Sequence, residues 1–166
     1  MTISLRPAAP EDAEAVMRLH LRCHEEAYGR HLPPEFFAMR RETLPGRVDN
    51  LRKGIAAGHV PTLAYDGGGL LGVAGAGPAR DSDAPAELEL NWIYTLERAY
   101  GSGAGQLLLD AVIGKQAAFL WVLEDNPRAQ AFYAKNGFVL DGTRKLLPPE
   151  WHSLPEVRMI RPAAAG

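Results

Sequence analysis

The chain has 166 residues, of which 46% are hydrophobic and 23% are charged, and its formal net charge at pH 7 is −2. These values are typical of one globular domain with a buried core, and they argue against nucleic acid as a partner. Cys23 is the only cysteine, so no intrachain disulfide can form and a reducing compartment is expected. The sequence shows no signal-peptide pattern and no apolar run of roughly 20 residues, so we expect a cytoplasmic protein without a membrane partner.

The first half of the chain predicts strands and amphipathic helices in alternation. In chain order we expect a strand at 2–8, a helix at 10–29, a short helix within a broken segment at 32–46, a helix at 47–58 and strands at 61–66 and 70–80. Pro10 suits the first turn of the first helix and Gly29 its end. Glycines at 67–69 predict a hairpin between the two strands.

The second half has stronger patterns. Residues 86–95 alternate, with Leu88 and Leu90 on one face and Glu87 and Glu89 on the other, which indicates a strand. After it we expect a helix ending near Gly114, a strand at 117–123, a helix at 126–137 and strands at 138–142 and 155–162. This order predicts a three-layer mixed α/β fold, in which residues 87–123 form a right-handed crossover between parallel strands.

Residues 98–112, "RAYGSGAGQLLLDAV", place three glycines directly before a helix. Backbone amides at a helix N-terminus are unpaired, and glycines let a ligand approach them, so the segment suits a phosphate. The alternative is a tight turn needed only for packing. The phosphate loop of nucleotide hydrolases does not match, because Gln106 and Leu107 follow Gly105, and neither register fits the dinucleotide fingerprint.

Gly103 and Gly105 before that helix, with Asn126, Tyr133 and the Gly137–Phe138 pair behind it, resemble the GCN5-related N-acetyltransferase (GNAT) family. The resemblance covers the whole order of strands and helices. It implies one GNAT-like domain over residues 1–166, with a mixed sheet of six to seven strands splayed between the fourth and fifth strands and helices on both faces.

The same resemblance implies acetyl coenzyme A (acetyl-CoA) as co-substrate, with its pyrophosphate on the amides of 101–105 and its pantetheine arm beside the fourth strand. The residues implied for coenzyme binding are Ile93, Tyr94, Thr95, Arg98, Tyr100, Gly101, Ser102, Gly103, Ala104, Gly105 and Asn126. Tyr100 departs from the family pattern, which has Gln or Arg at that position, and Ser102 carries no charge. Phosphate binding is therefore expected to rely on backbone amides, with Arg98 or Arg128 as helpers.

Two proton transfers need side chains, because an amine must lose a proton before attack and the thiolate gains from a donor. Tyr133 matches the family tyrosine near the coenzyme sulfur and is the expected acid; a half-buried core tyrosine is the alternative. Glu89 is the first candidate for the base and Glu87 the second, although both can simply face solvent. Relatives that acetylate ribosomal-protein amino termini have a glutamate where this chain has Trp121, so their mechanism does not transfer.

Residues 28–37 correspond to the family's acceptor-pocket wall. The candidates to bind the acceptor are Tyr28, His31, Phe36 and Trp92, with Trp151 as a lesser one. His20, Cys23 and His24 cluster on one helix, but the first two lie on its core face and no carboxylate pair completes a site, so no metal is expected.

The resemblance thus implies an N-acetyltransferase that moves an acetyl group from acetyl-CoA to a primary amine of a small molecule, by direct attack in a ternary complex. A non-catalytic acyl-CoA-binding sensor and a protein N-terminal or lysine acetyltransferase are the alternatives. A homodimer is one expectation for the assembly.

Overall fold

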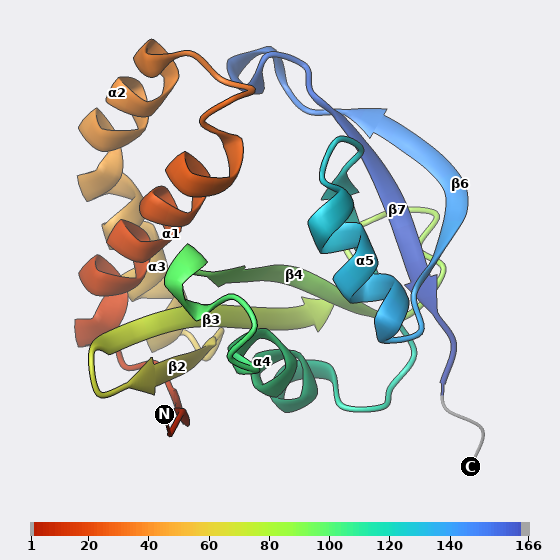
Figure 1. Ribbon diagram of the computed structural model, residues 1–166, viewed down its shortest axis with the longest axis horizontal. Coiled ribbons are helices and arrows are strands. Elements are labelled where there is room, and N and C mark those ends of the chain that lie inside the picture. The colour runs from red at the N-terminus through yellow and green to blue at the C-terminus, as the bar shows by residue number, and fades with distance from the viewer. Residues whose placement is uncertain (1, 164–166) are drawn as a thin grey trace. The chain divides into compact units, whose positions relative to one another are not determined.

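The computed structural model describes residues 2–163 of the chain (Figure 1). The elements are β1 (Ser4–Pro7), α1 (Ala13–Tyr28), α2 (Pro34–Glu42), α3 (Leu44–Ala56), β2 (Thr62–Asp66), β3 (Gly69–Pro78), β4 (Leu88–Thr95), α4 (Ala104–Ile113), β5 (Ala118–Leu123), α5 (Pro127–Lys135), β6 (Val139–Leu146) and β7 (Pro155–Arg161). Short 3-10 helices lie at Pro10–Asp12, Glu97–Ala99 and Pro149–Trp151.

The strands form one sheet with the order β1-β2-β3-β4-β5-β7-β6. Strands β4 and β5 are parallel and pair at Glu89 and Phe119, whereas β1–β2, β2–β3, β5–β7 and β6–β7 are antiparallel. The predicted mixed sheet with helices on both faces is therefore confirmed.

The chain groups into two compact units. Unit 1 comprises the residues up to Gly75 together with Trp92–Val112, and unit 2 comprises Ala76–Asn91 and the chain from Ile113 onward. Strands β3 and β4 each contribute residues to both units. One domain over residues 1–166 stays a prediction.

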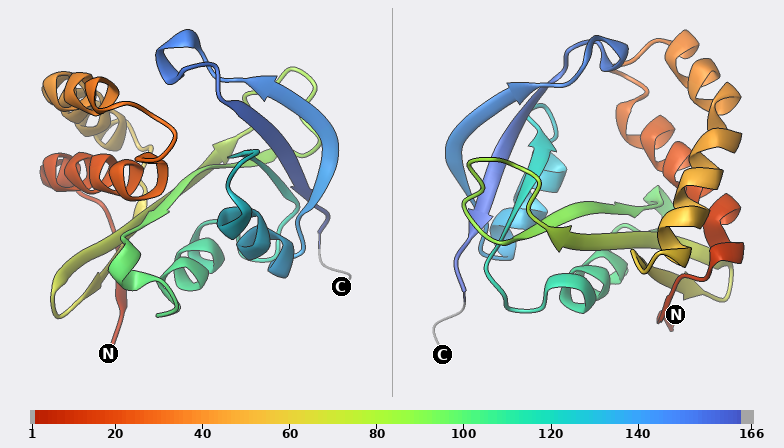
Figure 2. Two further views of the ribbon diagram at one scale, coloured as in Figure 1. Left: turned by 45° about the horizontal axis from the view of Figure 1, so that its top comes forward. Right: turned by 180° about the vertical axis from the view of Figure 1, so that it is seen from behind.

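Unit 1 has helices on both faces of its strands (Figure 2). On one face, Val16 of α1 and Ile55 of α3 pack with Leu63 of β2 and Val73 of β3. On the other face, a second cluster joins α4 to the same strands through Ala104, Leu108, Ala64 and Leu71. Burying a side chain of this size contributes roughly 1.5–3 kcal/mol, so these two clusters hold the strands between the helices.

In unit 2, β5 and β6 flank β7. The Asn126 side chain caps α5 by accepting a hydrogen bond from the Ala129 amide at 3.2 Å, as the sequence predicts. Near the end of α5, the Arg161 guanidinium of β7 lies 5.2 Å from the centre of the Phe138 ring and donates to the Gly114 carbonyl at 2.8 Å. The cationic side chain thereby ties β7 to the segments that flank α4 and α5.

Several element boundaries differ from the prediction by a few residues, and two of the differences have a clear physical reason. Helix α3 begins at Leu44 rather than at residue 47, because Pro45 occupies its first turn, where a missing N–H costs nothing. Strand β6 continues to Leu146 instead of ending at Gly142. Gly142 has φ 88°, and the register with β7 shifts between Leu140 and Arg144, so the glycine forms a bulge within the strand.

Candidate functional site

The glycine loop of unit 1 is held in a conformation that requires glycine. Gly101 has φ 79° and Gly103 has φ 92°, and a Cβ added at either position would meet nothing within 4 Å. The glycines are thus needed for their backbone angles, and the space beside them is open. Helix α4 begins immediately afterwards at Ala104, so the first amides of the helix and the loop amides are in one segment.

Side chains in and next to this loop form hydrogen bonds within the protein and hold the loop in place. The Ser102 hydroxyl donates to the Ala99 carbonyl at 2.5 Å and accepts from the Ala104 amide at 3.2 Å. Arg98 forms a two-pronged ion pair with Asp66, at 2.9 and 3.4 Å. The guanidinium that the sequence suggests as a phosphate helper is therefore bound to a carboxylate of β2. Tyr100, at the position of the family's Gln or Arg, is exposed.

The second half of β4 brings four predicted site residues into unit 1. Trp92 and Tyr94 pack on the face covered by α1 and α3, while Ile93 packs on the face covered by α4, as the predicted alternation requires. Two glycines of β3 make room for this strand. A Cβ at Gly75 would lie 2.3 Å from the Trp92 indole nitrogen, and one at Gly72 would lie 2.7 Å from the Tyr94 carbonyl oxygen.

Rings from α1 surround Tyr94. The centre of its ring lies 4.6 Å from that of His20 and 5.0 Å from that of His24, and His24 lies 5.3 Å from Tyr28. Among the predicted acceptor residues, Tyr28 and Trp92 thus belong to one aromatic group in unit 1. Phe36 is only 5% exposed and packs against Phe37 at 5.2 Å, whereas His31 is half-buried.

Unit 2 holds the predicted catalytic residues Tyr133, Glu89 and Glu87. Glu89 is 2% exposed, and its carboxylate is already bound by Arg80. The Arg80 backbone amide and Nε donate to Oε1 at 3.1 and 3.2 Å, and Nη2 donates to Oε2 at 2.7 Å. Glu87 is exposed, and its carbonyl accepts from the Ala79 amide at 2.9 Å.

Tyr133 lies on α5 and is 8% exposed. Its ring lies 5.5 Å from Phe132 and 5.9 Å from Phe138, measured between centres. Packing on two rings fixes the direction of the phenol, which suits a proton donor and equally suits a core residue. Asn126, about two turns before it, uses its side-chain oxygen to cap α5.

Glu156 on β7 is an acidic residue that the sequence analysis missed. The register pairs Glu156 with Leu123 and Arg158 with Trp121, and Phe119 pairs with Glu89, so these side chains share one face of the unit 2 sheet. Burial raises the pKa of Glu156, and the charge of Glu89 adds to the rise, while Lys145 and Arg80 oppose it. No cation within residues 2–163 forms an ion pair with Glu156.

The same face carries an acidic cluster around the buried Arg158. Its guanidinium contacts Asp141 at 2.6 Å, Asp83 at 3.0 Å and Asp81 at 3.1 Å. Trp121 donates to Asp81 at 3.0 Å and lies 4.0 Å from the Lys145 ammonium. Trp121 is therefore part of a fixed polar network.

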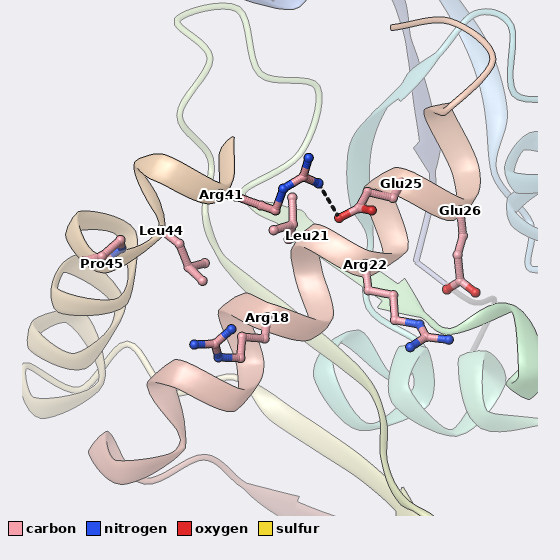
Figure 3. Close-up of a pocket in the computed structure, with 8 residues that line it drawn as sticks. All are labelled: Arg18, Leu21, Arg22, Glu25, Glu26, Arg41, Leu44 and Pro45. Atoms are coloured by element: carbon pink, nitrogen blue, oxygen red, sulfur yellow. Dashed lines mark ion pairs between the residues drawn. The ribbon is translucent and has the colours of Figure 1, made fainter. Parts of the chain in front are cut away.

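An open groove of about 660 Å³ lies between α1 and the start of α3 in unit 1 (Figure 3). Its lining residues are Arg18, Leu21, Arg22, Glu25, Glu26, Arg41, Leu44 and Pro45. Arg41 and Glu25 form an ion pair at 3.5 Å across it. None of these eight residues belongs to the predicted site.

Residues 2–163 show neither a candidate metal centre nor a helix that could span a membrane. In this part of the chain, His, Cys, Asp and Glu side chains do not gather in groups of three that could hold a metal ion. None of its helices combines the length and the apolar character that crossing a membrane needs.

A family model described as the acetyltransferase (GNAT) family matches residues 13–138. A probable N-acetyltransferase of Mycobacterium tuberculosis is 27% identical over 177 residues, covering 99% of this chain and 97% of that protein. An uncharacterized N-acetyltransferase of Mycobacterium bovis is 39% identical over 64 residues, and the match covers 35% of this chain but only 41% of that relative.

Solved structures show the same fold. The PaiA N-acetyltransferase of Thermoplasma acidophilum, solved in complex with coenzyme A, has a TM-score of 0.70 at 17% identity, covering 98% of this chain and 99% of that one. A protein of Pyrococcus horikoshii OT3 has a TM-score of 0.72 at 19% identity, over 99% and 100% of the two chains. The family match and the fold agree, and the chain belongs to the GNAT family of acetyltransferases.

Proposed function

We propose that this protein transfers an acetyl group from acetyl-CoA to a primary amine of a small molecule, within a ternary complex. The observation that carries the proposal is the loop before α4, where Gly101 and Gly103 adopt positive φ with open space beside them. A helix start preceded by left-handed glycines is suited to bind a pyrophosphate, and membership of the GNAT family implies a co-substrate that carries one.

The remaining coenzyme contacts are proposed on β4. Its segment Ile93–Thr95 lies in unit 1 directly before the loop, and Gly72 lets the Tyr94 carbonyl approach β3 closely. A backbone amide of this segment is proposed to donate to the thioester oxygen as negative charge builds there. Since Arg98 is bound to Asp66, we expect backbone amides to supply most of the phosphate contacts.

The chemistry needs one donor and one acceptor of protons. The amine nitrogen bonds to the acetyl carbon, the carbon–sulfur bond breaks, and Tyr133 gives its phenolic proton to the leaving sulfur. For the acceptor, Glu89 and Glu87 were the sequence candidates, but Glu89 already accepts three hydrogen bonds from Arg80. We therefore favour Glu156, which shares the face of Glu89, to take the amine proton directly or through a water.

In this arrangement Glu89 is a positioning residue. It holds Arg80 in place, and its charge favours the protonated form of Glu156. A base whose pKa is raised towards the working pH takes up a proton more readily than an ordinary carboxylate. Exposed Glu87 is the third candidate and serves as the control.

A panel of primary amines tests the function. Each amine is incubated with the protein and acetyl-CoA, released thiol is measured, and mass spectrometry identifies the acetylated amine. We expect amine-dependent thiol release with at least one class of small amine. Binding of acetyl-CoA without release across the panel would instead support the alternative of a non-catalytic acyl-CoA sensor.

The first prediction concerns the pH dependence of kcat. Tyr133→Phe is expected to lower kcat by about 10²–10⁴-fold and to remove the fall in rate at alkaline pH, because the phenolic proton is lost. Glu156→Gln is expected to lower kcat and remove the rise at acidic pH. Glu87→Gln should leave both limbs in place. If Glu89→Gln alone removes the acidic limb, Glu89 rather than Glu156 is the base.

One alternative and two further predictions belong to the same proposal. The alternative is a peptide acceptor, as in protein N-terminal or lysine acetyltransferases. One group of such enzymes has a glutamate where this chain has Trp121, and Trp121 is held here by Asp81 and Lys145. A cytoplasmic location and a homodimer also stay predictions. Size-exclusion chromatography with light scattering tests the dimer.

A further inference from the structure

Two histidines pack on the Tyr94 ring in unit 1, and two arginines lie close enough for their charges to act on both imidazoles. His20 and His24 come from α1, Arg40 from α2 and Arg47 from α3. The two imidazole centres lie 4.1 Å apart and within 5.0 Å of the Tyr94 ring centre. Both arginines are partly buried.

Arg47 is the member of this group whose charge is not balanced. Its Nη2 donates to the Arg40 carbonyl, while its Nε and Nη1 are buried without a hydrogen-bond partner. No carboxylate within residues 2–163 pairs with it. A guanidinium keeps its proton in proteins, so burial without an anion is costly.

Nearby groups do not supply the missing negative charge. Burial, together with the charge of Arg40, lowers the pKa of Arg47 to about 10, which is the effect of an environment without a counter-charge. Burial and the charges of Arg40 and Arg47 lower the pKa of His20 to about 3, so this imidazole is neutral at pH 7. Its Nδ1 is also buried without a partner.

Two carboxylates on the neighbouring helices are paired with other arginines. Glu25 on α1 pairs with Arg41 at 3.5 Å, and Asp49 on α3 pairs with Arg52 at 2.9 Å. With no carboxylate of residues 2–163 paired to it, Arg47 can bind an anion that enters from solution.

The position of the group indicates which ligand brings that anion. Tyr94 belongs to the segment proposed to contact the pantetheine arm, and Tyr28, a predicted acceptor residue, stacks near His24 at 5.3 Å. The group lies on the α1 and α3 face of the unit 1 strands, whereas the glycine loop and α4 lie on the opposite face. The coenzyme pyrophosphate is thus expected on the other side of the strands from Arg47.

We infer that the acceptor amine carries an anionic oxygen group, a carboxylate or a phosphate, which Arg47 binds with the support of the Arg40 charge; the inference rests on the proposed function. A guanidinium presents parallel N–H donors that match either oxyanion. The aromatic rings of Tyr94 and Tyr28 then flank the body of the acceptor. The substrate class is an amino acid or an aminoalkyl phosphate rather than a neutral or polycationic amine.

Matched amine pairs test this inference. Amino acids are compared with their amides, and O-phosphoethanolamine with ethanolamine, in the thiol-release assay. We expect kcat/KM to be about 10–100-fold higher for the acidic member of a pair, the range of a charge-assisted hydrogen bond. Preference in the first pairs identifies a carboxylate, and preference in the last pair identifies a phosphate.

Variants then assign the preference to Arg47. Arg47→Gln is expected to abolish the difference between pair members without changing the KM for acetyl-CoA, and Arg47→Lys to restore part of it. Arg52→Gln, an exposed arginine of the same helix, is the matched control and should keep the preference. Circular dichroism spectra check that each variant is folded.

Failure of the inference differs from failure of the proposed function. Equal kcat/KM for both members of every pair, or a preference that survives in Arg47→Gln, would overturn the inference while leaving an acetyltransferase. Absence of turnover with every amine would overturn the proposed function, and the inference with it.

Discussion

Gly75 on β3 is a glycine because the Trp92 indole occupies the space of its side chain. A Cβ there would lie 2.3 Å from the indole nitrogen and 2.8 Å from a ring carbon, distances that no packed core sustains. Both residues belong to unit 1, on neighbouring strands. The glycine thus determines where a predicted acceptor residue lies.

Gly75→Ala is expected to displace the Trp92 ring and to lower the free energy of unfolding by about 1–3 kcal/mol, the usual cost of overpacking. Tryptophan fluorescence reports the displacement, and urea unfolding reports the stability. Gly54→Ala, in α3, is the control, because an added Cβ there meets nothing within 4 Å. Unchanged fluorescence and stability in Gly75→Ala would contradict the close packing of the indole on this glycine.

Residue partners were the least predictable part of the site. The alternation at 86–95 predicts the strand and the face of Glu89, but the sequence does not reveal that Arg80 binds both oxygens of its carboxylate. Glu156 was read only as part of a strand, since its burial depends on neighbours in β5 and β6. Its strand also carries Arg158 and Arg161, so the pattern of residue types did not set Glu156 apart.

At the scale of elements, the ends of a helix were predictable where capping residues mark them in the sequence. Asn126 and Pro127 begin α5 as predicted, and Gly137 follows its end with φ 90°. Residues 32–46 were read as a broken segment, although Pro45 lies in the first turn of α3, because a proline can mark either a break or a helix start. The extent of β6 depends on pairing with β7 across a bulge, which a linear pattern does not contain.

Helix α1 carries a prediction of its own, because it buries His20 against Tyr94. The pKa of His20 is about 3 in the folded protein, mainly through burial, against an ordinary value of 6.5. The unfolded chain therefore binds a proton that the folded protein excludes, and the free energy of unfolding falls as pH drops from about 6.5 towards 3. One such imidazole changes it by about 1.4 kcal/mol per pH unit.

His24 contributes in the same direction, because burial, with the charges of His20, Arg40 and Arg47, lowers its pKa as well. Urea unfolding between pH 7 and pH 4.5 measures the slope. His20→Gln is expected to show a shallower loss of stability than the wild type, and His59→Gln, at an exposed position, an unchanged one. Parallel slopes in wild type and His20→Gln would contradict burial of a neutral imidazole.

For the whole molecule, the order of elements and two short motifs were enough to predict the family. The family model over residues 13–138 and the mixed seven-stranded sheet confirm that prediction. Substrate specificity was not predictable from the sequence, because the role proposed for Arg47 rests on neighbours that come together only when the helices pack on the strands of unit 1. The sequence assigned Arg47 merely to the start of an amphipathic helix.

Calorimetric titration with acetyl-CoA tests the central claim, that the glycine loop of this GNAT protein binds the co-substrate. The wild type is expected to bind with saturable heat at one site. Gly103→Ala is expected to bind about tenfold more weakly, because a Cβ at φ 92° costs roughly 1–2 kcal/mol and the loop leaves its binding conformation to relieve it. Absence of saturable binding in the wild type would contradict the account.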